Sequence, residues 1–183
     1  SGTVTITARP ISITADSASK VYDGIALTTT GRALTSGTLA TGDAIDSVTV
    51  SGSQTMAGTS ASIASSAVIL EGATDVTANY AITYLPGTLA VTAATRTDLN
   101  ITNYSGVYDG AAHSISVTNL ITGDAITYSL DGSIWTAEKP EFTNVTTGTT
   151  VYVKVTNPNF NDRTGSGTVT ITARPISITA DSA

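Results

Sequence analysis

Apolar and polar residues alternate with a period of two along most of this chain, which is the pattern of half-buried β-strands. Val4 and Ile6 alternate with threonine near the N-terminus, and the alternation recurs at 48–50, 115–117, 126–130 and 151–155. Asp-Gly and Gly-Asp pairs, which favour tight turns, lie between these runs at 23–24, 42–43, 109–110, 123–124 and 131–132. No segment shows a convincing apolar stripe at helical spacing. The pattern therefore predicts an all-β protein.

The first eighteen residues, SGTVTITARPISITADSA, recur without a change as the last eighteen, residues 166–183, so the repeat period from Ser1 to Ser166 is 165 residues. A weaker duplication lies within that period. KVYDG at 20–24 returns as GVYDG at 106–110, TGDAI at 41–45 returns at 122–126, and NYAITYLPGTLAVTA at 79–93 has a looser counterpart in NFNDRTGSGTVTITA at 159–173. Because the motifs keep their order, we expect two homologous modules of roughly 80 residues in each period.

The repeated segment contains a module boundary. Val4 and Ile6 are apolar at even positions, whereas Ile11 and Ile13 are apolar at odd positions. A strand cannot change its buried face without a break, and Pro10 supplies one. We therefore expect residues 1–8 to be the last strand of a preceding repeat, 9–94 to be module A, 95–173 to be module B, and 174–183 to be the first strand of the next repeat. The two end segments should be loosely ordered or paired with the edges of neighbouring molecules.

Several short alternating strands in each module favour two tandem immunoglobulin-like antiparallel β-sandwiches in an elongated array. The alternative is a pair of β-grasp-like modules, which would need one helix in each. The best helical candidates, 38–46 and 60–68, are interrupted by glycine or are rich in serine and β-branched residues. The sandwich is therefore the preferred fold.

The composition narrows the classes of function. Charged residues make up only 12% of the chain and the net charge is −6, which argues against nucleic-acid partners. The absence of cysteine excludes disulfides and thiol nucleophiles, and no apolar run is long enough for membrane insertion by this segment. The one imidazole, His113, has no flanking ligand pattern, and the carboxylates are scattered or lie in turns. We therefore expect no enzymatic activity.

Three stretches of module A resemble the YDG-type repeat domains of bacterial surface adhesins: RPISITADSASKVYDG at 9–24, GDAIDSVTVSGSQTMAGT at 42–59 and NYAITYLPGTLAVT at 79–92. Module B, with YSLDGSIWT at 128–136 and GTTVYVKVTNPNF at 148–160, resembles the related MBG-type and immunoglobulin-like repeats. The resemblance covers essentially the whole chain. It implies an extracellular protein at the bacterial cell surface, often anchored to the cell wall, and it brings no catalytic residues with it.

Two functions follow from this resemblance and from the repeats. The first is a structural spacer, or stalk, that projects a distal binding domain from the cell and whose partners are neighbouring repeats of the same chain. The alternative is a multivalent adhesin module that binds a glycan or a host protein. Trp135, Tyr128 and Phe142 lie within one stretch of module B and are the candidate ligand contacts.

Surface modules of this kind often carry an internal Lys–Asn amide bond, and one triplet here has the right order. Lys20 lies on an early strand and Asn79 precedes a late one, with Asp23 or Glu71 as the candidate acid. The competing interpretation is that Lys20 is a solvated surface lysine. Lys154, which alternates with Val153 and Val155, is expected to face solvent.

No cofactor is expected, with calcium as the one candidate. Asp16, Asp98 and the NPNFND stretch at 157–162 are rich in oxygen ligands, but none of them has the spacing of an EF-hand loop. Asp and Asn are also common in turns, so these residues have an ordinary structural explanation.

Overall fold

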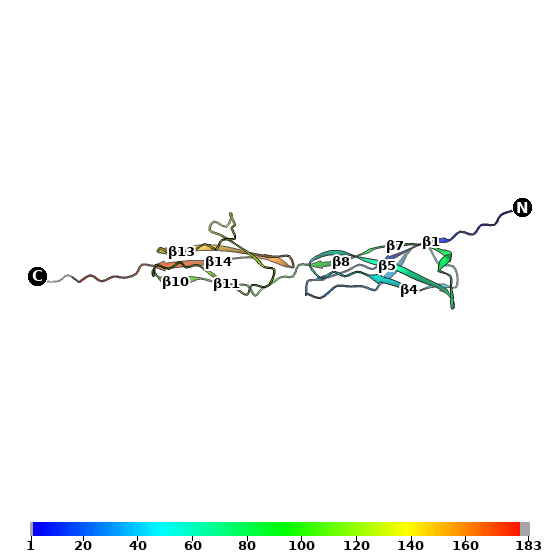
Figure 1. Cartoon of the computed structure of the whole chain (residues 1–183), viewed down its shortest axis with the longest axis horizontal. Coiled ribbons are helices and arrows are strands. Elements are labelled where there is room, and N and C mark those ends of the chain that lie inside the picture. Colours follow the sequence, from blue (N-terminus) through cyan, green and yellow to red (C-terminus); the bar gives the residue numbers. More distant parts are fainter. Residues whose placement is uncertain (1, 180–183) are drawn as a thin grey trace. The chain divides into compact units, whose positions relative to one another are not determined.

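The computed structural model describes residues 2–179 (Figure 1) and divides into two compact units. Unit 1 ends at Ala94 and unit 2 begins at Thr95. The regular secondary structure of the described residues consists of β-strands and one 3-10 helix, η1 (Thr77–Asn79), and no helix among these residues is long and apolar enough to cross a membrane. The prediction of an all-β protein is therefore confirmed. Residues 60–68, one of the two segments that a β-grasp fold could have used as a helix, lie within a strand.

Unit 1 contains two sheets. One has the order β3-β1-β7, and the other has the order β2-β8-β5-β4 with β6 beside β5. The strands are β1 (Arg9–Ala15), β2 (Ala18–Val21), β3 (Arg32–Ser36), β4 (Asp43–Ser51), β5 (Gly58–Glu71), β6 (Thr74–Asp75), β7 (Tyr80–Leu85) and β8 (Gly87–Thr92). The first two strands of unit 1, β1 and β2, thus lie in different sheets, and so do its last two, β7 and β8.

The first two strands of unit 1 run parallel to its last two strands. β1 pairs with β7 from Arg9 opposite Tyr80, and β2 pairs with β8 up to Val21 opposite Thr92. The sequence prediction of antiparallel sheets is wrong here, because both sheets are mixed. Alternation specifies which face of a strand is buried but says nothing about the direction of its neighbour.

The core of unit 1 lies between the two sheets. Its buried residues come from β1, β5 and β7, and they are Ile11, Ile13, Ala15, Ala64, Ala67, Ile69 and Tyr80. Each fully buried isoleucine contributes about 1.5–3 kcal/mol relative to an exposed one. Partly buried side chains of β4, among them Ile45 and Val48, pack against this cluster.

Unit 2 has one sheet with the order β10-β14-β13-β12 and a second sheet formed by β9 and β11. The strands are β9 (Asn100–Thr102), β10 (Tyr104–Val107), β11 (Ser116–Thr118), β12 (Ala125–Ser129), β13 (Thr146–Asn157) and β14 (Phe160–Thr172). β10 pairs in parallel with the end of β14. The core consists of Ile115, Tyr128, Val151, Val153, Val155, Val169 and Ile171.

Corresponding hydrogen bonds recur in the two units. The Tyr22 N–H donates to the Thr92 carbonyl, and the Tyr108 N–H donates to the Thr172 carbonyl, both at 2.8 Å. The bridge between Leu27 and Gln54 likewise matches that between His113 and Phe142. The largest difference is that β14 is continuous, whereas Pro86 separates β7 from β8. Proline has no N–H to donate to a strand ladder, which accounts for the interruption.

The two copies of the repeated segment are in complementary states. Residues 2–8 form no strand, and Val4 and Ile6 are 90% and 93% exposed, whereas their equivalents in β14, Val169 and Ile171, are buried. The reverse holds for the second half of the segment. Ile13 is buried in β1, and its equivalent Ile178 is 88% exposed. Each copy therefore contributes a strand through one half only.

Candidate functional site

The three candidate ligand contacts of unit 2 have different environments. Tyr128 is buried in the core, and this burial raises the pKa of its hydroxyl. Phe142 is partly buried and packs against the same core. Trp135 is partly exposed, and the Lys154 ammonium lies 4.9 Å from its ring centroid, a cation–π geometry. Tyr128 and Phe142 therefore belong to the core cluster of unit 2, whereas Trp135 lies outside it.

The segment around Trp135 is a loop between β12 and β13 that projects from the sheets (Figure 1). A Tyr128–Thr136 bridge closes its base, with backbone hydrogen bonds of 2.7 and 2.9 Å. Within the loop, the Asp131 carboxylate accepts hydrogen bonds from the Ile134 N–H at 2.8 Å and the Ser133 N–H at 2.7 Å. These bonds lower the pKa of Asp131, with the Ile134 bond having the largest effect. The loop is therefore fixed by its own hydrogen bonds.

This loop exposes apolar side chains. Ile134 is 72% exposed, and Leu130 is also exposed. Unit 1 has no equivalent, because eight residues separate Ile45 from the bridge at Gln54, whereas fifteen separate the corresponding Ile126 from the bridge at Phe142. Exposed isoleucine and leucine on a rigid projection are a surface that could contact another molecule.

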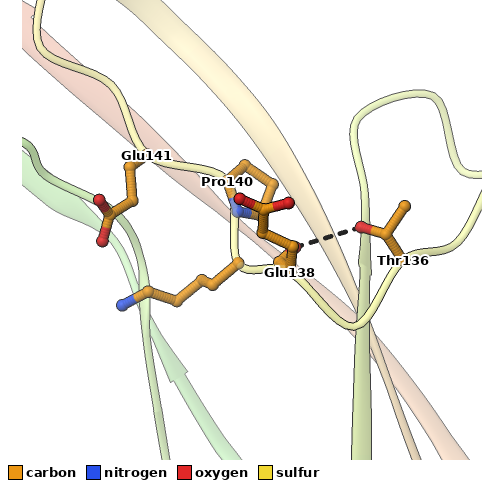
Figure 2. Close-up of a pocket in the computed structure, with 5 residues that line it drawn as sticks. Thr136, Glu138, Pro140 and Glu141 are labelled. Carbon is orange, nitrogen blue, oxygen red and sulfur yellow. Dashed lines mark hydrogen bonds between the residues drawn. The ribbon is translucent and has the colours of Figure 1, made fainter.

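A shallow polar hollow lies beside the loop (Figure 2). Its lining is Thr136, Glu138, Lys139, Pro140 and Glu141, and its volume is about 660 Å³. The Thr136 hydroxyl donates to the Glu138 carbonyl at 3.2 Å. Glu138, Lys139 and Glu141 are all exposed, so the charged side chains of this hollow lie at the surface of unit 2.

The structure brings together two of the three residues of the candidate amide. The Lys20 ammonium donates to the Asp23 carboxylate at 2.6 Å and to the Ile25 carbonyl at 2.5 Å. Asn79 directly precedes Tyr80, which pairs with Arg9 at the start of β1, whereas Lys20 pairs with Val91 near the end of β8. Asn79 and Lys20 therefore lie at opposite ends of the parallel strand pair, and no amide between them is geometrically possible in this fold.

The oxygen-rich residues proposed as calcium ligands serve other contacts. Asp98 pairs with Arg96, and the Asn157 amide donates to Asp124. Within residues 2–179, no three side chains of the Asp, Glu, His and Cys types gather at one point. The Asp16 N–H donates to the Gly31 carbonyl at 2.9 Å, at the point where the chain passes from β1 in one sheet to β2 in the other.

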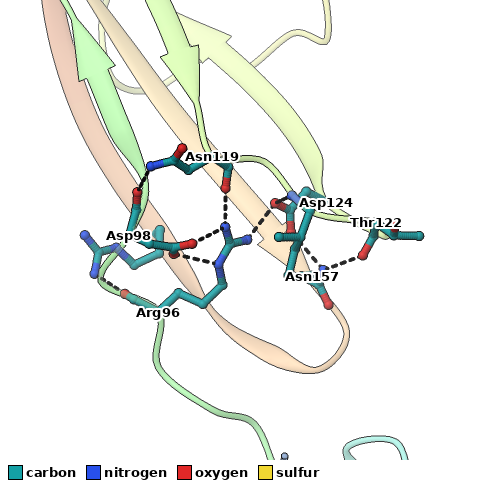
Figure 3. Close-up of polar contacts among 8 residues, drawn as sticks. Arg96, Asp98, Asn119, Thr122, Asp124 and Asn157 are labelled. Atoms are coloured by element: carbon teal, nitrogen blue, oxygen red, sulfur yellow. Dashed lines mark hydrogen bonds and ion pairs between the residues drawn. The ribbon is translucent and has the colours of Figure 1, made fainter. Parts of the chain in front are cut away.

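The most highly connected polar group of unit 2 is Arg96 (Figure 3). Its guanidinium donates to Asp124 at 2.6 Å, to Asp98 at 3.0 Å and to the Asn119 carbonyl at 2.5 Å. It also lies 5.6 Å from the centroid of the Phe160 ring. The Arg96 cation is buried and thus contacts its own neighbour Asp98 and two segments distant in the sequence, 119–124 and the one that carries Phe160.

Asp124 is the buried partner in this network, with a side chain only 2% exposed. Burial acts to raise its pKa, but the hydrogen bonds from the Ile121 N–H, Arg96 and Asn157 outweigh burial, and the net effect lowers the pKa. The hydrogen bond from Arg96 also lowers the pKa of Asp98. The network therefore stabilises both carboxylates in their charged form.

The aspartate of the repeated TGDAI motif has a different partner in unit 1. Asp43 accepts a hydrogen bond of 2.5 Å from the Tyr80 hydroxyl, which in turn accepts one of 2.9 Å from the Ala40 N–H. The position of Tyr80 is taken in unit 2 by Phe160, which has no hydroxyl. In unit 2 the Arg96 guanidinium takes the place of the tyrosine hydroxyl as the donor to the aspartate. Sequence reasoning found the repeated motif but not this role, although the Tyr-to-Phe change between NYAIT and NFNDR was a signal that could have revealed it.

Comparison with known proteins adds no relative: neither a protein-family model nor a curated protein matches this chain. The function must therefore be inferred from the sequence and the geometry alone.

Proposed function

We propose that this chain is a spacer from the tandem-repeat region of a bacterial cell-surface adhesin, where it holds a distal binding domain away from the cell. In this proposal the two units are immunoglobulin-like modules, the first of the YDG type and the second of the MBG type. The chain is extracellular, its partners are the neighbouring repeats, and it has no enzymatic activity.

One observation carries the proposal. In each unit an early strand runs parallel to a late one, β1 to β7 and β2 to β8 in unit 1 and β10 to β14 in unit 2, so the chain enters a unit at one end and leaves it at the other. In unit 1 this parallel register runs from Arg9 opposite Tyr80 to Val21 opposite Thr92. Thirteen residues at about 3.3 Å each give a span of roughly 40 Å. Because the chain enters and leaves at opposite ends, each unit adds its full length to an array.

Small-angle scattering on chains of one, two and three periods tests this proposal. A stiff spacer should add roughly 80 Å to the maximum dimension with each period. Growth closer to the square root of the number of periods is the behaviour of a flexible string and would count against a spacer. A variant in which residues 95–173 of one period are deleted provides the length control, because its array lacks one unit.

The alternative function, multivalent ligand binding, is favoured by the loop between β12 and β13. Leu130 and Ile134 are exposed there next to Trp135, and a spacer has no need for such a projection. Binding of the three-period chain to immobilised glycans and host matrix proteins tests this function. A variant carrying Leu130→Ser and Ile134→Ser should lose binding, and a variant with Ile25→Ser, which is also exposed but lies in unit 1 outside the loop, should retain it.

A further inference from the structure

The repeated segment is present twice. The copy at 166–183 shows how it leaves unit 2, and the copy at 1–18 shows how it enters unit 1. In unit 2 the strand β14 continues to Thr172, whose carbonyl accepts the Tyr108 N–H. In unit 1 the strand β1 starts at Arg9, the equivalent of Arg174, opposite Tyr80. Where a copy of unit 1 follows unit 2, a single residue, Ala173, therefore separates the last strand of one from the first strand of the next.

This spacing leaves almost no room between two such units. From Thr172 to Arg174 the backbone spans two Cα–Cα steps, or at most about 7.6 Å. The ends of the two units must therefore touch around Ala173. The stretch between β8 and β9, residues 93–99, is much longer, so the argument applies only to the joint at which unit 1 follows unit 2.

Each unit has a surface at this point. In unit 2, Tyr108, Asn144 and Val145 form a groove with Ala173 and Arg174. Val145 is exposed there, and the Tyr108 side chain is partly so. In unit 1, Ala78 and Asn79 form a small hollow with Ala8 and the two residues before it. Ala8 and Ala173 are the same position of the repeated segment, so one alanine borders both surfaces.

We propose that the Tyr108–Asn144–Val145 surface of unit 2 docks against the Ala78–Asn79 end of a following copy of unit 1 and makes this joint a fixed one. The inference rests on the proposed tandem array, and it names the partner as a second copy of this chain's own unit 1. Contact at this point buries Val145 and the exposed face of Tyr108. The Asn79 side-chain amide of the following unit 1 can then form hydrogen bonds with the backbone of unit 2. Ile176 enters the new core in the place that Ile11 has in unit 1.

A chain lengthened by residues 19–94 after Ala183 tests the joint, because residues 174–183 then supply the first strand of the added unit. The natural chain contains no cysteine, so two introduced thiols can be followed without interference. Val145→Cys is combined with Ala78→Cys in the added unit and treated with a short bis-maleimide, and the products are read by mass spectrometry. The matched control carries Val145→Cys with Ala78→Cys in the original unit 1, which has the same chemistry without the one-residue joint.

We expect an intramolecular cross-link in the added-unit pair at a yield at least tenfold above that of the control. Amide hydrogen exchange at residues 174–179 shows separately whether the added unit has folded on that strand. Protection of these amides without the preferred cross-link overturns the joint while the array survives. Absence of protection means that the repeated segment does not build a new unit, and both the joint and the proposed spacer fail.

Discussion

The Tyr80 hydroxyl donates a hydrogen bond of 2.5 Å to the Asp43 carboxylate, and it joins the last part of unit 1 to the motif that begins β4. The Ala40 N–H acts to lower the pKa of Tyr80, but the carboxylate and burial outweigh it and raise the pKa. Unit 2 keeps the aspartate as Asp124 and satisfies it with Arg96. In both units the aspartate of the TGDAI motif is partly buried and has a side-chain donor, but the donor is a tyrosine in unit 1 and an arginine in unit 2.

Removal of the tyrosine hydroxyl should weaken unit 1 alone. Tyr80→Phe leaves Asp43 without its side-chain donor, and we expect a drop of roughly 4–8 °C in the melting temperature of unit 1. Amide exchange of peptides from β4 and β7 provides the measurement. Tyr152→Phe, at an exposed hydroxyl of unit 2, is the control and should change neither unit. Equal protection in Tyr80→Phe and the natural chain would contradict the assignment.

Removal of the guanidinium should have a larger effect on unit 2. Arg96→Met leaves the buried Asp124 charge unpaired, and we expect the melting temperature of unit 2 to fall by on the order of 10 °C. Trp135 is the only tryptophan of the chain and lies in unit 2, so its fluorescence reports this unit by itself. Arg32→Met, at an exposed position of unit 1, serves as the control.

The solution used by unit 1 should be transferable to unit 2. When Phe160→Tyr is added to Arg96→Met, the new hydroxyl occupies the position that Tyr80 has in unit 1. Part of the lost melting temperature should return, and Phe160→Tyr in the presence of Arg96 should gain nothing. If the double variant is no more stable than Arg96→Met alone, the two aspartates are not structurally equivalent.

Unit 2 should be acid-sensitive. The pKa values of Asp124 and Asp98 are lowered in the folded state, so their contribution to stability is complete above the unfolded value near 3.9 and is lost as the pH falls below it. Trp135 fluorescence in a titration from pH 6 to pH 2 measures this loss. Asp124→Asn should flatten the pH dependence below pH 4, and an unchanged profile in that variant would count against the network as its source.

The two isoleucines at one position of the repeated segment allow a test in which the surrounding sequence is identical. Ile13→Ala removes a fully buried side chain and should cost unit 1 about 2–5 kcal/mol of unfolding free energy. Ile178→Ala changes an exposed side chain and should stay within about 0.5 kcal/mol. Denaturant unfolding followed by amide exchange measures both. A similar cost for the two variants would show that the terminal copy is also packed.

The candidate surface residues could be predicted only in part. Aromatic and charged residues were identifiable by their type, but packing against the core separated Tyr128 and Phe142 from Trp135, and strand direction separated Asn79 from Lys20. Neither property is visible in the local pattern. A residue's neighbours in a sheet come from strands that are distant in the sequence, and here β1 pairs with β7 and β2 with β8.

The sequence by itself determined the strands, the turns, the duplication and the change of buried face at Arg9-Pro10, because these depend on local alternation and on residues with special backbone preferences. Only the tertiary structure decided that β1 runs parallel to β7 and β10 to β14, and that Arg96 neutralises Asp124, a residue 28 positions away. Alternation selects a face but not a neighbour. The neighbour is selected by how the two sheets close over a shared core, and that choice involves the whole unit at once.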